Sequence, residues 1–277
     1  MKGRWDSDDI PLRPAISPTD WMRVLWRGTL LAALVFGGLL ILLLVRLLER
    51  PLCGLNRPVT PGITQFVCRN AFRIMGIKHH VLGTPMPGRG AVVCNHVSWL
   101  DIFSLNVAKR IYFVSKSEVA DWPGIGWLAR ATGTLFIERN PARAKEHTQV
   151  FQQRLLAGHK LLFFPEGTST DGRQVLPFKT TLFQAFFAQD LKDEIAVQPV
   201  SLIYSAPKGT DPRFYGWWGD MSFGSHLLST LAPARQGGVT VIYHPVLRVA
   251  DFADRKALAL ACETAVRRGT EQTFELP

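Results

Sequence analysis

The 277-residue sequence predicts an α/β fold, in which helices flank a largely parallel mixed sheet behind an N-terminal membrane helix and a second, amphipathic interfacial helix. Two observations predict this arrangement. From residue 80 onward, short apolar runs alternate with segments of helical periodicity, as in sheets built from strand–helix–strand units. Near the N-terminus, residues 28–45 form a stretch without charged residues. We therefore expect three parts: a polar, mobile tail at 1–20, a membrane anchor at 21–80 and one globular domain at 81–277.

The stretch 28–45 is expected to form a membrane helix. It would be about 27 Å long at 1.5 Å per residue, close to the ~30 Å hydrocarbon core of a bilayer. A buried core helix is the alternative, but a soluble helix has no need to be apolar on every side. Glu49-Arg50-Pro51 is expected to end the helix. Arginines lie on both sides, so charge does not orient the helix, and a full span and a helix seated in one leaflet both stay open.

A second helix is expected at 62–78. Apolar residues recur there at helical spacing, with basic residues between them: Ile63, Phe66, Val67, Ala71 and Ile74, and Arg69, Arg73 and Lys78. This composition suits a helix on an anionic bilayer surface, and equally an amphipathic helix packed on the domain. Its position directly after a membrane segment favours the interface.

The remaining elements alternate along the globular domain. Strands are expected at 91–95, 111–115, 134–138, 160–164, 195–204 and 239–247, and helices at 100–108, 124–131, 141–157, 178–190 and 254–268. Pro199, inside the fifth of these strands, predicts an edge strand or a bulge. The aromatic cluster at 214–218 fits a lipid interface or a packed lid, and the sequence favours neither.

Charge and cysteine usage limit the classes of partner. The formal net charge of +10 favours an anionic partner, such as an acidic lipid surface, an anionic substrate or a nucleic acid. The basic residues are spread out and follow the membrane segments, which argues against a nucleic acid. The four cysteines are scattered, without a C-x-x-C pair or zinc spacing, so we expect reduced thiols on the cytoplasmic side and no metal site.

His96 stands where the apolar run 91–94 ends and the helix at 100–108 begins, which is the edge where α/β sheets bind ligands. Asp101, five positions later, can accept a hydrogen bond from one imidazole nitrogen and leave the other as a general base. The alternative is structural, because Ser98 and Asp101 are spaced as in a capping box. These residues alone leave both interpretations open.

Two cationic residues also follow apolar runs. Arg139 follows the strand expected at 134–138, and its planar guanidinium suits a phosphate or a carboxylate. A surface salt bridge with Glu138 is the alternative. Lys116 follows the strand expected at 111–115, where it adds positive charge or is only a solvated lysine.

A turn follows the strand expected at 160–164, in the run Phe164-Pro165-Glu166-Gly167-Thr168-Ser169. Gly167 permits close backbone approach, so that N–H groups face an oxyanion, and Glu166 is placed to bind an acceptor hydroxyl. A tight turn capped by Thr168 or Ser169 is the alternative.

The ordered set N-H-x-x-x-x-D, F-I-x-R, F-P-E-G-T and V-x-P-V resembles the glycerolipid acyltransferase family that includes 1-acylglycerol-3-phosphate acyltransferases, over about residues 60–205. The resemblance implies that His96 deprotonates the acceptor hydroxyl, that Asp101 orients His96, and that the oxygen attacks an acyl thioester without an acyl-enzyme. It implies head-group contacts by Lys116 and Arg139, and a pocket shaped by Glu166, Gly167 and Thr168. No metal or cofactor is expected, and the acyl donor is acyl carrier protein or coenzyme A.

Two departures concern the acceptor. Glu138 stands where the family often has Asp, and Ser169 stands where many phosphatidic-acid-forming members have Arg. The runs E-G-T-S-T-D-G and W-W-G-D-M are similar to bacterial members that acylate lyso-ornithine lipid. We expect a membrane-bound enzyme on the cytoplasmic face of the bacterial inner membrane that acylates 1-acyl-sn-glycerol 3-phosphate. Lyso-ornithine lipid, alone or as a second acceptor, is the first alternative, and a non-catalytic lipid-binding protein is the other.

Overall fold

The computed structural model describes residues 5–7, 9–11, 15–138, 144–188 and 190–274. Within them, eight strands form one sheet in the order β1-β7-β6-β2-β5-β3-β4, with β8 also paired to β6. The strands are β1 Lys78–Leu82, β2 Gly90–Cys94, β3 Tyr112–Lys116, β4 Leu135–Ile137, β5 Leu161–Phe163, β6 Ala196–Ser205, β7 Gly238–Tyr243 and β8 Leu247–Arg248. Only the pairings of β6 with β7 and with β8 are antiparallel. The predicted largely parallel mixed sheet is therefore confirmed.

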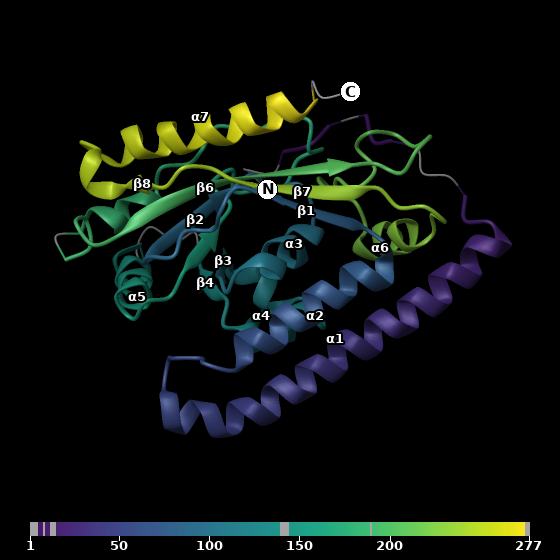
Figure 1. The fold of residues 1–277 in the computed structure, drawn as a ribbon, viewed down its shortest axis with the longest axis horizontal. Coiled ribbons are helices and arrows are strands. Elements are labelled where there is room, and N and C mark those ends of the chain that lie inside the picture. Colours follow the sequence, from purple (N-terminus) through teal and green to yellow (C-terminus); the bar gives the residue numbers. More distant parts are fainter. Residues whose placement is uncertain (1–4, 8, 12–14, 139–143, 189, 275–277) are drawn as a thin grey trace.

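Helices cover both faces of the sheet (Figure 1). They are α1 Pro18–Cys53, α2 Thr60–Met75, α3 Leu100–Ala108, α4 Ile125–Thr132, α5 Ala144–Leu156, α6 Phe223–Leu231 and α7 Arg255–Phe274, with short 3₁₀ turns at Ser117–Asp121, Leu182–Phe187 and Val249–Asp251. Successive strand residues point to opposite faces. Val92 and Cys94 of β2 accordingly join the core beneath α2 and α3, whereas Ala91 and Val93 join the core beneath α5 and α7.

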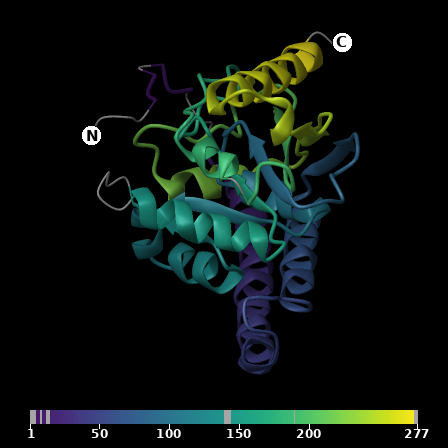
Figure 2. The same cartoon turned by 90° about the vertical axis from the view of Figure 1, so that its left-hand side faces the viewer.

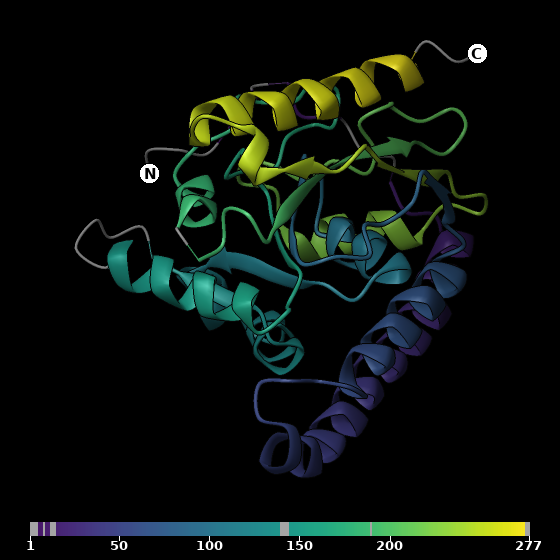
Figure 3. The ribbon, with the colours of Figure 1, turned by 60° about the vertical axis from the view of Figure 1, so that its left-hand side comes forward.

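The first two helices form a hairpin that extends away from the sheet (Figures 2 and 3). Ser17 and Asp20 make a capping box at the start of α1. Gly38 of α1 lies so close to α2 that an added Cβ would stand 2.4 Å from Cγ2 of Val67. The carboxylate of Glu49 accepts the backbone N–H groups of Val59 and Thr60, so it caps the start of α2. The predicted helices at 28–45 and 62–78 are both present, the first of them extended at both ends.

Helix α1 is docked on the domain through its N-terminal half. Its Arg27 is buried and donates to the carbonyl oxygens of Leu231 and Pro233 at 2.8 and 2.7 Å, at the end of α6. Much of the rest of α1 exposes large apolar side chains. Of the residues described, this helix is the one long and apolar enough to cross a membrane.

Three local predictions were wrong. Pro51 does not end α1, which continues to Cys53, because a proline in the last turn removes only one hydrogen bond near the helix end. In place of the helix expected at 178–190, the described residues of that segment form the 3₁₀ turn Leu182–Phe187, whose buried phenylalanines three apart suit that tighter helix as well as an α-helix. Of the two alternatives for Pro199, the edge strand is wrong, since β6 lies between β2 and β7, whereas the bulge stays a prediction. This proline sits where the neighbour of β6 changes from β8 to β7.

The sequence did not predict β1 or α6. Strand β1 is a mostly exposed edge strand without apolar alternation, and it starts before the domain boundary expected at residue 81. In the segment left undecided, Phe214, Tyr215 and Trp218 are buried, so most of the aromatic cluster is packed core. In the described part of the tail, the ring of Trp5 lies 5.8 Å from that of Trp218.

Candidate functional site

The site begins where β2 ends, and Asn95 makes the transition. Its side-chain amide donates to the carbonyl of Leu202 at 2.9 Å, and its side-chain oxygen accepts the N–H of Leu202 at 2.7 Å. These two bonds extend the hydrogen-bond ladder between β2 and β6 by one residue, with the side chain of Asn95 in place of its main chain. The main chain is thereby free to leave the sheet at His96, at the carboxyl edge of β2.

His96 and Asp101 are in contact. Nδ1 of His96 lies 2.7 Å from Oδ2 of Asp101, while the imidazole side chain is 23% exposed and the carboxylate is fully buried. The imidazole stacks on the ring of Phe164, with centroids 4.0 Å apart and planes 10° apart. An ionised Asp101 accepts from Nδ1–H, so Nε2 carries the lone pair. Phe164 therefore holds one face of the imidazole and Asp101 holds Nδ1, which leaves Nε2 to act on a ligand.

Asp101 also starts helix α3. Its Oδ2 accepts the N–H groups of Val97 and Ser98 at 2.8 and 3.0 Å, and its Oδ1 accepts the hydroxyl of Tyr204 at 2.8 Å. The bond from the Ser98 N–H is the carboxylate half of the predicted capping box. One carboxylate therefore contacts both the imidazole of His96 and the N–H groups just before α3, so the geometry is compatible with both interpretations of Asp101.

Glu166 is buried beside the turn that carries His96. Its Oε1 accepts the N–H of His96 and its Oε2 the N–H of Leu176, each at 2.7 Å, and the side chain is buried. Burial raises the pKa of Glu166 to about 8, against the lowering effect of these two N–H donors. Each oxygen accepts one backbone N–H, so this carboxyl group links the turn at His96 to the segment at Leu176.

Gly167 and Thr168 form the turn beside His96. Gly167 has a φ of +72°, which favours glycine, and its N–H donates to the carbonyl of Phe164 at 3.0 Å. The hydroxyl oxygen of Thr168 accepts the N–H of Trp5 at 3.4 Å. The N-terminal tail therefore touches this turn, which the sequence did not predict.

The two predicted cationic residues are placed differently. Lys116 is half-buried at the carboxyl end of β3, the same edge of the sheet as His96, but β5 separates β3 from β2. Arg139 lies outside the described residues. The structure brings together His96, Asp101, Glu166, Gly167 and Thr168, and it places Lys116 further along the edge.

The loop before α6 also holds the site, and sequence analysis missed it. The N–H of Trp217 donates to the carbonyl of Val97 at 2.9 Å. The indole N–H of Trp99 donates to Nδ1 of His226 at 3.0 Å, and Nε2–H of this buried histidine donates to the carbonyl of Gly216 at 2.8 Å. The run W-W-G-D-M contains Trp217 but does not indicate its partner, because the contacts of Trp217 with Val97 and of Trp99 with His226 join residues more than a hundred positions apart.

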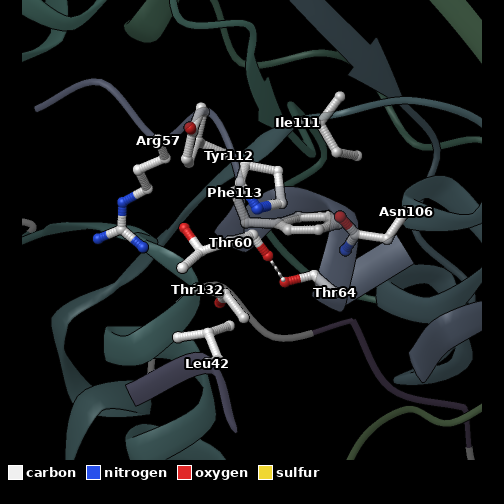
Figure 4. Close-up of a pocket in the computed structure, with 10 residues that line it drawn as sticks. Leu42, Arg57, Thr60, Thr64, Asn106, Ile111, Tyr112, Phe113 and Thr132 are labelled. Carbon is white, nitrogen blue, oxygen red and sulfur yellow. Dashed lines mark hydrogen bonds between the residues drawn. The ribbon is translucent and has the colours of Figure 1, made fainter. Parts of the chain in front are cut away.

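Two hollows lie away from His96. One lies between α1, α2, α3, β3 and α4, with Arg57, Thr60 and Phe113 among its walls (Figure 4). The other is mostly apolar, with Lys109 and Lys160 among its walls. Neither is lined by the predicted site residues. Among the described residues, no three His, Cys, Asp or Glu side chains are grouped to hold a metal ion.

Comparisons with known proteins bear on the whole chain. The acyltransferase family model matches residues 79–203, which contain His96, Asp101 and Glu166. A lyso-ornithine lipid O-acyltransferase from Rhodobacter capsulatus is 57% identical over 270 residues, covering 97% of each chain. A 1-acyl-sn-glycerol-3-phosphate acyltransferase from Neisseria gonorrhoeae is 39% identical over 100 residues, 36% of this chain and 39% of that one. The crystal structure of a 1-acyl-sn-glycerophosphate (LPA) acyltransferase from Thermotoga maritima has a similar fold, with a TM-score of 0.65 at 21% identity, over 94% of this chain and 98% of that one.

Proposed function

The chain belongs to the acyltransferase family and acts on lysolipids, and we propose that its acceptor is lyso-ornithine lipid, whose free hydroxyl receives a fatty acyl group from a thioester. The observation that carries this choice is the similarity to the Rhodobacter enzyme, which extends over 97% of both chains. Ser169 supports it, because an arginine at that position would favour a phosphate-bearing acceptor. The sequence analysis placed 1-acyl-sn-glycerol 3-phosphate first and lyso-ornithine lipid second, and this proposal reverses that order of acceptors.

Lysophosphatidic acid is the second candidate acceptor. The Neisseria relative favours it, but that similarity is confined to 100 residues. Ornithine carries an amine that is cationic at neutral pH, whereas lysophosphatidic acid carries only negative charge on its head group. The two acceptors therefore differ in the charge that the site must accommodate, and one added cation should shift the preference between them.

The proposed reaction uses His96 as a general base. Its Nε2 takes the proton of the acceptor hydroxyl as the hydroxyl oxygen attacks the thioester carbonyl. The carbon–sulfur bond then breaks, an ester remains, and the imidazolium returns the proton to the thiolate that leaves. A positioned base of this kind contributes roughly 10²–10⁴-fold to the rate. No acyl-enzyme forms, so no serine or cysteine nucleophile is needed.

The other proposed roles follow from the geometry. Asp101 stabilises the imidazolium that forms during attack and keeps Nε2 directed outward. Glu166 positions the backbone of His96, rather than the acceptor hydroxyl. Gly167 and Thr168 shape the turn next to the imidazole, and Lys116 and Arg139 stay proposals for the head group. The acyl donor in this proposal is acyl carrier protein or coenzyme A, without a further cofactor.

We also propose that the hairpin holds the enzyme on a membrane, on its cytoplasmic face. Apolar side chains along α1 are exposed, among them Phe36, Leu40 and Leu44, and Trp127 of α4 is 65% exposed. Arg27 ties α1 to the end of α6, and Arg57, just beyond α1, donates to the carbonyl of Ala131 at the end of α4. Contacts with the domain near both ends of α1 favour a hairpin seated in one leaflet over a helix that crosses the bilayer.

One experiment tests the acceptor. Purified protein in mixed micelles is offered the same labelled acyl thioester with lyso-ornithine lipid and with lysophosphatidic acid in parallel, and the labelled product is identified. We expect ornithine lipid to form faster. Ser169→Arg should move the ratio of the two rates toward phosphatidic acid. Formation of phosphatidic acid alone by the unaltered enzyme would overturn the choice of acceptor.

A second arm tests whether the site is catalytic. His96→Ala is expected to fold, with the thermal midpoint of the unaltered protein, and to lose transfer to both acceptors. If the variant keeps substantial turnover, His96 is not the base. If the unaltered protein binds lysolipid in the same micelles but transfers no acyl group from either thioester, the alternative of a non-catalytic lipid-binding protein is favoured.

A further inference from the structure

Strand β6 contacts both ends of the segment that carries His96. The main chain of Leu202 holds the side-chain amide of Asn95 through two hydrogen bonds, at the start of the segment. Tyr204, two residues later, donates its hydroxyl to Oδ1 of Asp101 at 2.8 Å, at the end of the segment. A single strand therefore fixes the distance between the end of β2 and the start of α3, and it does so partly through a tyrosine that no motif contains.

We propose that Tyr204 is a positioning residue for acyl transfer, because its hydroxyl fixes the oxygen of Asp101 that does not touch His96. This inference rests on the proposed function. It adds a third member to the pair of His96 and Asp101, from a part of the chain about a hundred residues away.

The hydrogen bonds of Asp101 are unequally divided. Oδ2 accepts three donors, from His96, Val97 and Ser98, whereas Oδ1 accepts the hydroxyl of Tyr204. A carboxylate rotates readily about its last bond, so a group anchored through one oxygen can turn away from the imidazole. The bond from Tyr204 prevents that rotation. It also supplies a donor to a buried anionic oxygen, whose burial without one is costly.

The tyrosine is itself held in place. Its hydroxyl oxygen lies 3.0 Å from Oγ of Ser104, whose single proton is shared between this oxygen and the carbonyl of Leu100, 3.1 Å away. Both residues belong to α3, the helix that carries Asp101. Burial, followed by the charge of Asp101, raises the pKa of Tyr204 well above its usual value, so its hydroxyl keeps the proton that the bond requires.

Removing the hydroxyl should change the pH dependence of the reaction. In Tyr204→Phe the carboxylate of Asp101 has one hydrogen-bond donor fewer, so this carboxylate stabilises the protonated imidazolium of His96 more strongly. We expect the acid limb of the kcat profile to move to higher pH by about one unit. The rate should fall about tenfold on that limb and recover to within about threefold at the plateau, with the apparent KM for the thioester unchanged within about twofold.

Tyr215→Phe is the matched control. Tyr215 is buried too, its ring lies 5.7 Å from that of Tyr204, and its hydroxyl donates to Oε1 of Gln236 at 2.6 Å. This variant also removes a hydroxyl that makes two hydrogen bonds, one to Gln236 and one from the N–H of Gly237, but none to Asp101, so its acid limb should keep the position of the unaltered enzyme. An equal shift in both variants would overturn the inference.

Other titratable groups face the pair. Glu166 contacts the His96 backbone, Cys94 precedes it on β2, and Arg267 of α7 acts on Glu166. All three are unchanged in both tyrosine variants, so their effects on the position of the acid limb are the same in the two variants. If Tyr204→Phe fails to fold, Ser104→Ala replaces it, since it weakens the support of the hydroxyl and should shift the limb in the same direction by less.

A double-mutant cycle completes the test. In the Asp101→Asn variant the carboxylate charge is absent, so adding Tyr204→Phe should lower the rate on the acid limb by less than about threefold, in place of about tenfold. A full tenfold loss on that background would overturn the inference. Its failure is distinguishable from that of the proposed function: an active His96→Ala removes the base itself, whereas an inactive His96→Ala with an unshifted Tyr204→Phe profile rejects only the role of Tyr204.

Discussion

The substitution Asp101→Asn separates the two roles that this carboxylate combines. The two backbone N–H groups of Val97 and Ser98 face Oδ2 and cannot be reversed, so they should select the amide oxygen at that position. The amide nitrogen then takes the place of Oδ1, next to the hydroxyl of Tyr204, which can rotate to accept. Nδ1–H of His96 keeps an acceptor, and the tautomer with Nε2 free is retained. The variant therefore keeps the cap of α3 and loses the charge.

The size of the effect follows from that charge. Opposite unit charges about 4 Å apart interact by about 4 kcal/mol at the effective dielectric constant of 20 that describes protein sites. The neighbouring donors already offset part of this attraction, so about 3 kcal/mol is expected, which corresponds to about a hundredfold in rate. The imidazolium is destabilised, so the acid limb should move to lower pH, opposite to the direction expected for Tyr204→Phe.

The assay is the initial rate of labelled ester formation from pH 5.5 to 9, with the thermal midpoint measured on the same preparations. The cap should lose about 1 kcal/mol, because two bonds to a charged acceptor become bonds to a neutral one. If Asp101→Asn keeps more than a tenth of the activity at the plateau while His96→Ala is inactive, Asp101 serves only as a helix cap. The electrostatic reasoning is then refuted.

Three further predictions concern stability, each measured by denaturant unfolding in detergent. Gly38→Ala should lower the free energy of unfolding by about 1–3 kcal/mol, because its methyl would meet Val67, whereas Gly37→Ala has open space around it and should raise that free energy by about 0.5–1 kcal/mol. Equal effects would show that α1 and α2 are not in close contact. Arg27→Met should lower it by about 1–3 kcal/mol, because two carbonyl oxygens at the end of α6 lose their donor, and a neutral result would contradict the docking of α1. The pKa of Glu166 is about 8 in the folded protein, against an ordinary value of 4.5, so its contribution to the free energy of unfolding is present below about pH 4.5 and is lost as the pH rises through 8. Glu166→Gln should therefore reduce the fall in the free energy of unfolding between these pH values. An unchanged fall would mean that another group causes it.

The elements that sequence analysis predicted well are those with a local signal. Helix α3 spans 100–108 as expected, because a capping pair and an apolar run define both of its ends within ten residues. The contact of His96 with Asp101 was also predictable, since a spacing of five residues across one strand–helix turn brings the two side chains together.

The contacts that sequence analysis missed depend on pairings between distant strands and loops. Tyr204 reaches Asp101 only because β6 lies beside β2, which the sequence does not state, and Pro199 argued for an edge strand instead. Glu166 looked like a substrate ligand because its neighbours form a turn, but its two acceptor oxygens face the N–H groups of His96 and Leu176. These contacts share one feature: the partner of a side chain across the sheet leaves no periodic pattern in the sequence.

The spacing of the first motif follows from the double use of Asp101. The carboxylate must stand in the first turn of α3 to accept N–H groups before the helix, and it must face back toward the end of β2 to reach the imidazole. One residue more or fewer between His96 and Asp101 would turn the carboxylate by about 100° around α3, which removes both interactions together. The cap and the orientation of the base are therefore not separable by changing the length of the turn. They are separable by changing the charge alone, which is why the asparagine variant decides between them.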